Sequence, residues 1–190
     1  MSMKAVVAYL GAMLKPLGFS RKNANWNRQS GSFVQVINLQ SSQFSETLTA
    51  NLGVFDKGIY ERFWRRSPAG VIREVDCIVR ARIGELMGSG DRWWSSEAEG
   101  TATEIARELT EHALPFLDRF RSRGDLEQYL IETGVAMRRL PLPIIYLALL
   151  KADRGDRTAA CEMLTALRSR PIGGWLDDVS RVSAELGCGR

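Results

Sequence analysis

The stretch Ser32–Phe55, SFVQVINLQSSQFSETLTANLGVF, indicates two β-strands joined by a polar turn. Successive side chains of a strand point to opposite faces of a sheet. In residues 33–40 each face is half apolar, which is typical of a central strand. In residues 47–54 the apolar side chains share one face, and Thr47, Thr49 and Asn51 share the other. We therefore expect the second strand to have one buried and one polar face.

Two further segments show a similar alternation. Residues Asn25–Arg28 form a short strand that ends at the turn signal Gln29-Ser30-Gly31. Residues Val75–Ile83 form a fourth strand, in which Cys77 points inward and Asp76, Arg80 and Arg82 point outward. Short connections between successive strands favour an antiparallel meander.

Helical patterns precede and follow these strands. Residues 3–14 carry an apolar stripe that ends before Pro16, and residues 101–117 carry another that Pro115 ends or kinks. Residues 125–133, 143–151 and 157–168 complete a helical C-terminal third. The predicted fold class is therefore α+β, a four-stranded antiparallel meander sheet packed by the N-terminal and middle helices. This domain covers residues 1–122, and a helical C-terminal extension covers 123–190.

Composition and charge limit the class of protein. Among 190 residues, 45% are hydrophobic and 25% are charged, as in ordinary globular domains. No apolar run is long enough to span a bilayer, and the N-terminal stripe lacks a signal-peptide cleavage pattern, so we expect a cytoplasmic protein without membrane contact. The net charge is +4, and the first 45 residues hold five basic and no acidic side chains. The basic residues are Lys4, Lys15, Arg21, Lys22 and Arg28.

The sequence offers little catalytic chemistry. Cys77, Cys161 and Cys188 are odd in number and lack CxxC spacing, so neither a disulfide framework nor a zinc site is predicted. His112 is the single histidine, and no GxSxG or HExxH motif accompanies it. The remaining candidate for a catalytic pair is Cys77 as nucleophile with His112 as base, which would have to lie close together in the fold. We expect no catalytic residue, no cofactor and no metal.

Several short motifs resemble a known bacterial family. They are Leu17-Gly18-Phe19-Ser20-Arg21-Lys22, Asn25-Trp26-Asn27-Arg28, Val36-Ile37-Asn38-Leu39-Gln40-Ser41, Asn51-Leu52-Gly53, Arg82-Ile83-Gly84 and Trp93-Trp94. In order and spacing they resemble the domain of unknown function 4304 over residues 5–120. The resemblance implies a compact α+β domain and no assigned activity, ligand or catalytic residue. Residues 145–167 separately resemble one tetratricopeptide-type helical pair, which alone makes no binding solenoid.

Two groups of residues are candidates for binding. The polar sheet face offers Asn38, Gln40, Asn51, Arg80 and Arg82, which suit an acidic or amide-bearing partner. The alternative for this face is cross-strand hydrogen bonding in solvent. The irregular connections offer Trp64, Arg65, Arg66, Trp93 and Trp94. Such side chains anchor protein interfaces or stack on nucleic-acid bases, and the tryptophans alternatively plug the core.

These patterns lead to three functional hypotheses. The first is a non-catalytic protein-binding module, in its most specific form an immunity protein that neutralises a cognate toxin. The second is a nucleic-acid-binding module that uses the basic first quarter and the loop tryptophans. The third is an enzyme of unknown type.

Overall fold

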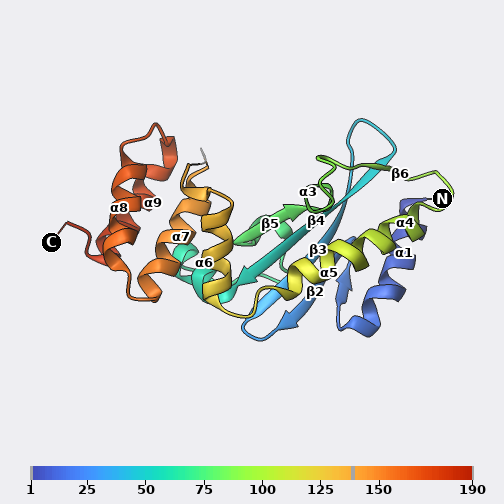
Figure 1. Cartoon of the computed structure of the whole chain (residues 1–190), viewed down its shortest axis with the longest axis horizontal. Helices are drawn as coiled ribbons and strands as arrows, with labels where there is room; N and C mark the ends of the chain where they lie inside the picture. Colours follow the sequence, from blue (N-terminus) through green and yellow to red (C-terminus); the bar gives the residue numbers. More distant parts are fainter. Residues whose placement is uncertain (1, 138–139, 190) are drawn as a thin grey trace. The chain divides into compact units, whose positions relative to one another are not determined.

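The computed structural model describes residues 2–137 and 140–189, which form two compact units (Figure 1). The first unit contains the residues up to Tyr60 and Ser67–Arg121. The second contains Glu61–Arg66 and the chain from Ser122 onward. The first unit holds an antiparallel sheet with helices and the second is helical, so the α+β class is confirmed.

The sheet has six strands among the described residues, where four were predicted. They are β1 (Ser20–Lys22), β2 (Asn25–Ser30), β3 (Phe33–Ser41), β4 (Thr47–Asp56), β5 (Val79–Arg82) and β6 (Trp94–Ser95). Strands β1 to β5 are neighbours in sequence order, β6 pairs with β4, and every pair is antiparallel. The predicted meander is therefore present, with a short strand added before it and another after it.

The fourth strand starts later than predicted. Residues Glu74–Asp76 form a 3-10 turn, and ladder pairing with β4 begins at Val79. Val75 is half exposed, whereas Cys77 is buried beside Gly53 of β4, on the face that carries Asn51. Cys77 was predicted to point to the face opposite Arg80 and Arg82, and this prediction was wrong, because Cys77 lies on their face. The 3-10 turn interrupts the inward and outward alternation of side chains that the sequence suggests.

Helices cover one face of the sheet. These are α1 (Met3–Leu14) and the run formed by α4 (Thr101–Glu108), a π-helical segment (Leu109–Ala113) and α5 (Leu114–Asp118). Apolar side chains of β2, β3 and β4 on this face are almost fully buried, among them Trp26, Ile37 and Leu52. Gln35 lies on the same face and donates through Nε2 to the carbonyl of Leu117, 2.8 Å away, which fixes α5 against β3.

The middle helix is altered at Pro115, as predicted. Proline lacks an N–H donor and crowds the preceding turn. Just before Pro115 the helix widens into a π-helical segment, in which the N–H of Leu114 bonds to the carbonyl of Leu109. At the start of this helix Gly100 is the N-cap, and the Thr101 hydroxyl donates to the Ser95 carbonyl at 2.7 Å.

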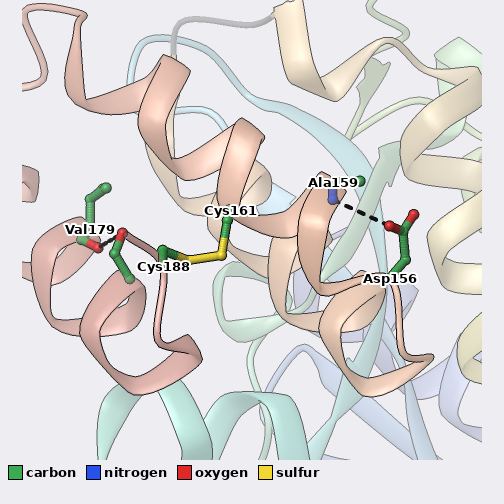
Figure 2. The surroundings of a disulfide bond; sticks show 6 residues. Asp156, Ala159, Cys161, Val179 and Cys188 are labelled. Carbon is green, nitrogen blue, oxygen red and sulfur yellow. Dashed lines mark hydrogen bonds between the residues drawn. A yellow bond between two sulfur atoms is a disulfide. The ribbon is translucent and has the colours of Figure 1, made fainter. Parts of the chain in front are cut away.

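The second unit consists of helices around a separate core. They are α6 (Arg123–Glu132), α7 (Pro141–Asp153), α8 (Arg157–Arg168) and α9 (Leu176–Leu186), and the unit also takes residues 61–66 from the end of α2 (Lys57–Trp64) and the turn after it. Helices α7 and α8 form the predicted hairpin, and Asp156 caps α8 by accepting from the Ala159 N–H at 3.2 Å (Figure 2). Their likeness to a tetratricopeptide pair stays a prediction. Across residues 2–137 and 140–189, the helices are too short or too polar to cross a bilayer.

A disulfide bond joins Cys161 of α8 to Cys188, just after α9 (Figure 2). The two Cα atoms are 5.3 Å apart and the residues are separated by 27 positions. The sequence prediction of no disulfide was therefore wrong. Spacing gave no signal, because the pairing depends on how α8 and α9 pack and not on a local motif.

Candidate functional site

A row of polar side chains crosses the sheet from β1 to β5. The strand register places Lys22 opposite Asn25, Asn25 opposite Asn38, Asn38 opposite Asn51, and Asn51 opposite Arg82. Directly opposed residues point to the same face of a sheet. These five residues, here called the polar row, therefore lie side by side on the sheet face opposite the one that α1 and the α4–α5 run cover. The predicted gathering of Asn38, Asn51 and Arg82 on one face is found in the structure.

Hydrogen bonds connect Asn51 of the polar row to Asn38 and to Gln40, which lies beside the row on β3. Asn51 donates through Nδ2 to Gln40 Oε1 at 2.8 Å and to Asn38 Oδ1 at 3.4 Å. Asn51 is only 6% exposed, whereas Gln40 is exposed and Asn38 is half-buried. Asn51 therefore fixes the orientation of the two amides that reach the surface. The cross-strand hydrogen bonding considered as the alternative is present at this point, and it leaves Gln40 accessible.

One amide of the polar row has an unused acceptor. Asn25 donates through Nδ2 to the carbonyl of Ile72 at 2.7 Å, while its Oδ1 is buried without a hydrogen-bond partner in the part of the chain that the structure describes. A buried carbonyl oxygen without a donor costs about 1–3 kcal/mol. Such an atom is consistent with a donor supplied from outside the chain.

The Asn25 end of the polar row borders a cavity of about 550 Å³. Lys22, Asn25 and Asn38 line its sheet side, and residues between Ala69 and Val75 line the opposite side. Lys22 has no ion pair among the described residues, whereas Arg73 bonds to Asp76 at 3.2 Å. The cavity therefore combines amide groups with one uncompensated cation.

The rest of this sheet face is covered, which corrects the expectation of an open polar side. Val36, Phe55 and Tyr60 form an apolar cluster with Ile72 and Cys77 from the segment that crosses the strands. The side chain of Asn27 also bonds to this segment, accepting from the Ile72 N–H at 2.9 Å. The part near the cavity and Gln40 remains open to a partner, and Arg80 and Arg82 of β5 are partly exposed on the same face. Asp76, predicted on this face, lies in the 3-10 turn instead.

The arginines of the sheet face are charge-compensated. Arg80 pairs with Glu74, and Arg82 pairs with Asp91 at 2.6 Å. The Arg82 guanidinium also lies 5.6 Å from the ring centre of Trp93, which is half-buried. Hydrogen bonds from Trp93 and then from Arg82 lower the pKa of Asp91. Trp93 and Arg82, predicted in two separate groups, therefore belong to one surface cluster, in which Asp91 compensates the charge of Arg82.

Trp94 is a core residue. It is 3% exposed and pairs with β4 through Leu48. Its Nε1 is buried without a hydrogen-bond partner among the described residues, and the neighbouring Arg92 pairs with Glu104 at 2.7 Å. Of the two adjacent tryptophans, Trp94 therefore plugs the core, and Trp93 alone offers an accessible ring.

Trp64, Arg65 and Arg66 belong to the second unit. Trp64 is 37% exposed and donates through Nε1 to the Tyr146 hydroxyl at 3.0 Å. Arg65 pairs with Glu185, and the exposed Arg66 lies 5.6 Å from the Trp64 ring centre. These residues form a second candidate surface, which we treat separately from the polar row because each unit is described by itself.

Cys77 and His112 are not brought together. Cys77 packs against Val36 and beside Gly53, on the polar-row face. His112 belongs to the helical run that Gln35 anchors on the opposite face, and its Nε2 lies 3.4 Å from Glu108. This pair therefore forms no nucleophile and base dyad.

A small group of possible metal ligands was not anticipated from the sequence. Ligand atoms of Glu108, Glu111 and His112 lie within 4.8 Å of one another. Glu108 is nearly buried and already accepts from Arg107 at 2.6 Å. A cation would have to compete with this guanidinium, so the geometry gives little support to a metal centre here. The helical spacing of three and four residues is the signal that would have identified the group.

We predict that Cys77 makes the protein less stable at alkaline pH. Burial, and then the carboxylates of Glu74 and Asp76, raise the pKa of its thiol well above the ordinary value of 9.0. The folded chain keeps the proton where the unfolded chain has released it, so stability is complete below pH 9 and falls as the pH rises above it. The slope reaches about 1.4 kcal/mol per pH unit while only the unfolded chain is ionised.

Urea unfolding between pH 7 and 10.5 measures this effect in the wild type and in Cys77→Ala, with the disulfide intact. At pH 7 the variant is expected to be less stable by about 1 kcal/mol, because a small cavity replaces the sulfur. The difference should shrink as the pH rises. Parallel profiles for the two proteins would show that the thiol does not contribute to the alkaline loss.

Comparison with known proteins identifies one family. A family model described as a domain of unknown function (DUF4304) matches residues 10–119, which is more than half of the chain. The match covers the polar row and the helical run of the first unit, and it ends before α6. No curated protein matches the chain. No solved structure matches it either.

Proposed function

We propose, from the premise that this chain belongs to the family of the domain of unknown function 4304, that it is a non-catalytic protein-binding module. Its contact surface is the open part of the polar row, with the adjoining cavity. The observation that carries the proposal is the buried, unpaired Oδ1 of Asn25 beside the uncompensated Lys22. A suitable partner would supply an N–H donor to the Oδ1 of Asn25 and a carboxylate to the ammonium group of Lys22.

The chemistry of the cavity favours a protein segment as its occupant. Amide side chains such as Asn25 and Asn38 bond equally well to backbone N–H and C=O groups, which every polypeptide offers. Lys22 adds a preference for an acidic side chain at the rim. Asn51 is held by Gln40 and fixes the surface amides, so we assign it to positioning and not to contact.

The finer form of the proposal is an immunity protein whose partner is a toxin. In that case the captured partner would be an acidic protein with a damaging activity, and the purified chain would inhibit that activity at a one-to-one ratio. A partner whose activity is unchanged in the complex would leave the chain a binding module of another kind.

Capture from an extract of the native organism tests the surface, with Asn38→Ala and Lys22→Glu as site variants. Loss of one partnered hydrogen bond costs about 1.4 kcal/mol, so Asn38→Ala should weaken the recovered complex about tenfold. Lys22→Glu should weaken it at least as much, because it places a carboxylate against the acidic partner. The matched control is Lys4→Glu, which makes the same charge change at an exposed position of α1.

The same variants separate protein binding from nucleic-acid binding. The alternative has specific support, because Lys15 and Arg21 line a second open cavity between α1 and β1, and neither forms an ion pair among the described residues. Binding to nucleic acid depends on summed charge and falls steeply with salt. Equal weakening by Lys22→Glu and Lys4→Glu, together with salt-sensitive retention of nucleic acid, would replace the protein-binding proposal by the alternative.

A further inference from the structure

The disulfide of the second unit lies in a surface groove. Cys161 and Cys188 are both half-buried, and both line a cavity of about 990 Å³ that is open to solvent. Arg157 and Glu162 of α8 and Gly187 line the same groove. The two sulfur atoms join α8 to the residues after α9 (Figure 2). The bond is therefore placed where an incoming molecule can approach it, unlike a disulfide sealed in a core.

Cys188 is held in place by backbone bonds that do not depend on the disulfide. Its N–H donates to the carbonyl of Ser183 at 2.9 Å, and the N–H of Gly187 donates to that of Ala184 at 3.0 Å. Gly187 has a φ of +67°. These bonds form the motif that commonly ends a helix at glycine. Because α9 itself fixes the backbone of Cys188, its thiol is expected to stay beside Cys161 after the bond is broken.

The electrostatic surroundings of the two cysteines differ. The Arg157 guanidinium lies against Gly187, so close that a Cβ added there would meet its Nη2. Glu162 follows Cys161 directly in α8 and carries a negative charge in the same groove. A nearby cation stabilises a thiolate and a nearby carboxylate destabilises it. Cys188 is therefore the better leaving group, and the sulfur of Cys161 is the better point of attack.

We propose that Cys161 and Cys188 form a reversible redox site whose substrate is a thiol. A thiolate attacks Sγ of Cys161, the sulfur–sulfur bond breaks, and its electron pair leaves on Sγ of Cys188, the residue that follows the Gly187 contacted by Arg157. A second thiol attacks the mixed disulfide and releases Cys161. Two thiols are oxidised to one disulfide, and the protein disulfide is reduced to two thiols that take up the two protons. The reverse sequence, with an oxidised thiol, closes the bond again.

The test uses the full oxidised chain in buffers of reduced and oxidised glutathione at pH 7.5, with alkylation and mass spectrometry to count free thiols. We expect both cysteines to exchange reversibly while the circular dichroism spectrum is unchanged, and Cys77 to stay unmodified because it is buried. Cys188→Ser should trap a glutathione adduct on Cys161. A parallel arm with a protein dithiol, thioredoxin, identifies the source: reduction by thioredoxin alone assigns the site to protein dithiols, and reduction by both assigns it to thiols in general.

Arg157→Gln and its matched control Arg168→Gln, on the same helix but outside the groove, test the electrostatic part. Removing the positive charge near the leaving thiol should slow reduction about threefold, so Arg157→Gln is expected to be slower and Arg168→Gln unchanged. Equal rates in these variants would overturn the role of Arg157. Reduction that occurs only as fast as urea unfolds the second unit, or failure of the pair to close again in oxidised glutathione, would overturn the proposal itself.

Discussion

Gly84→Ala is expected to destabilise the first unit by about 3 kcal/mol. A Cβ at this position of α3 (Ile83–Leu86) would overlap the carbonyl oxygen of Gly90 and lie 2.6 Å from the backbone nitrogen of Arg92. Backbone atoms cannot move aside as the end of a side chain can, so the loop that contains Gly90 and Arg92 must shift as a whole. Overpacking of this kind costs about 1–3 kcal/mol, and more where the neighbour is rigid.

The shift should also be visible in the surface cluster of Arg82. The displaced loop carries Asp91 and Trp93, which bond to Arg82 and stack beside it. Urea unfolding gives the loss of stability, and the tryptophan emission of the folded protein reports on the loop. Gly174→Ala is the control, because a Cβ there meets nothing within 4 Å, and it should change stability by no more than about 0.5 kcal/mol. Equal stability of the two variants would contradict the crowding at Gly84.

The central strands were predictable because alternation in sequence reports directly on the two faces of a strand. Asn38 and Asn51 were placed on one face by this pattern alone, and the register then set them opposite each other. Strands β1 and β6 were missed because three and two residues are too few to show a period. In residues 75–78 the same alternation occurs without a ladder, since the 3-10 turn at Glu74–Asp76 interrupts it.

The candidate site was only half predictable. Residue types and alternation indicated the amides of the sheet face, but the cavity exists because residues 69–75 cross the strands there. The same crossing buries Val36 and Cys77 and closes the rest of the face. Nothing local in the sequence specifies which part of a face such a segment covers. The disulfide was missed for a related reason, since the packing of α8 against α9 brings Cys161 to Cys188.

Gln35 is a buried polar residue that joins a strand to a helix. Its replacement is the second large effect that we predict. It is fully buried, donates through Nε2 to the Leu117 carbonyl at 2.8 Å, and accepts from Nε of Arg28 at 2.7 Å. Arg28 in turn pairs with Asp118 at 2.5 Å. The amide therefore ties β3 to the end of α5 and orients the arginine between them.

Gln35→Ala should lower the free energy of unfolding by about 3–4 kcal/mol. It opens a cavity and removes the Gln35 donor from the Leu117 carbonyl, which is left with the longer bond from the Phe120 N–H at 3.4 Å. Gln35→Met keeps the volume and loses only the hydrogen bonds, so it should cost about 1–2 kcal/mol. Asp118→Ala should cost under about 1 kcal/mol, because its side chain is 54% exposed and the ion pair is screened. Urea unfolding of the three variants ranks these contributions. A Gln35→Met protein as stable as the wild type would mean that packing, and not the amide, holds α5 on the sheet.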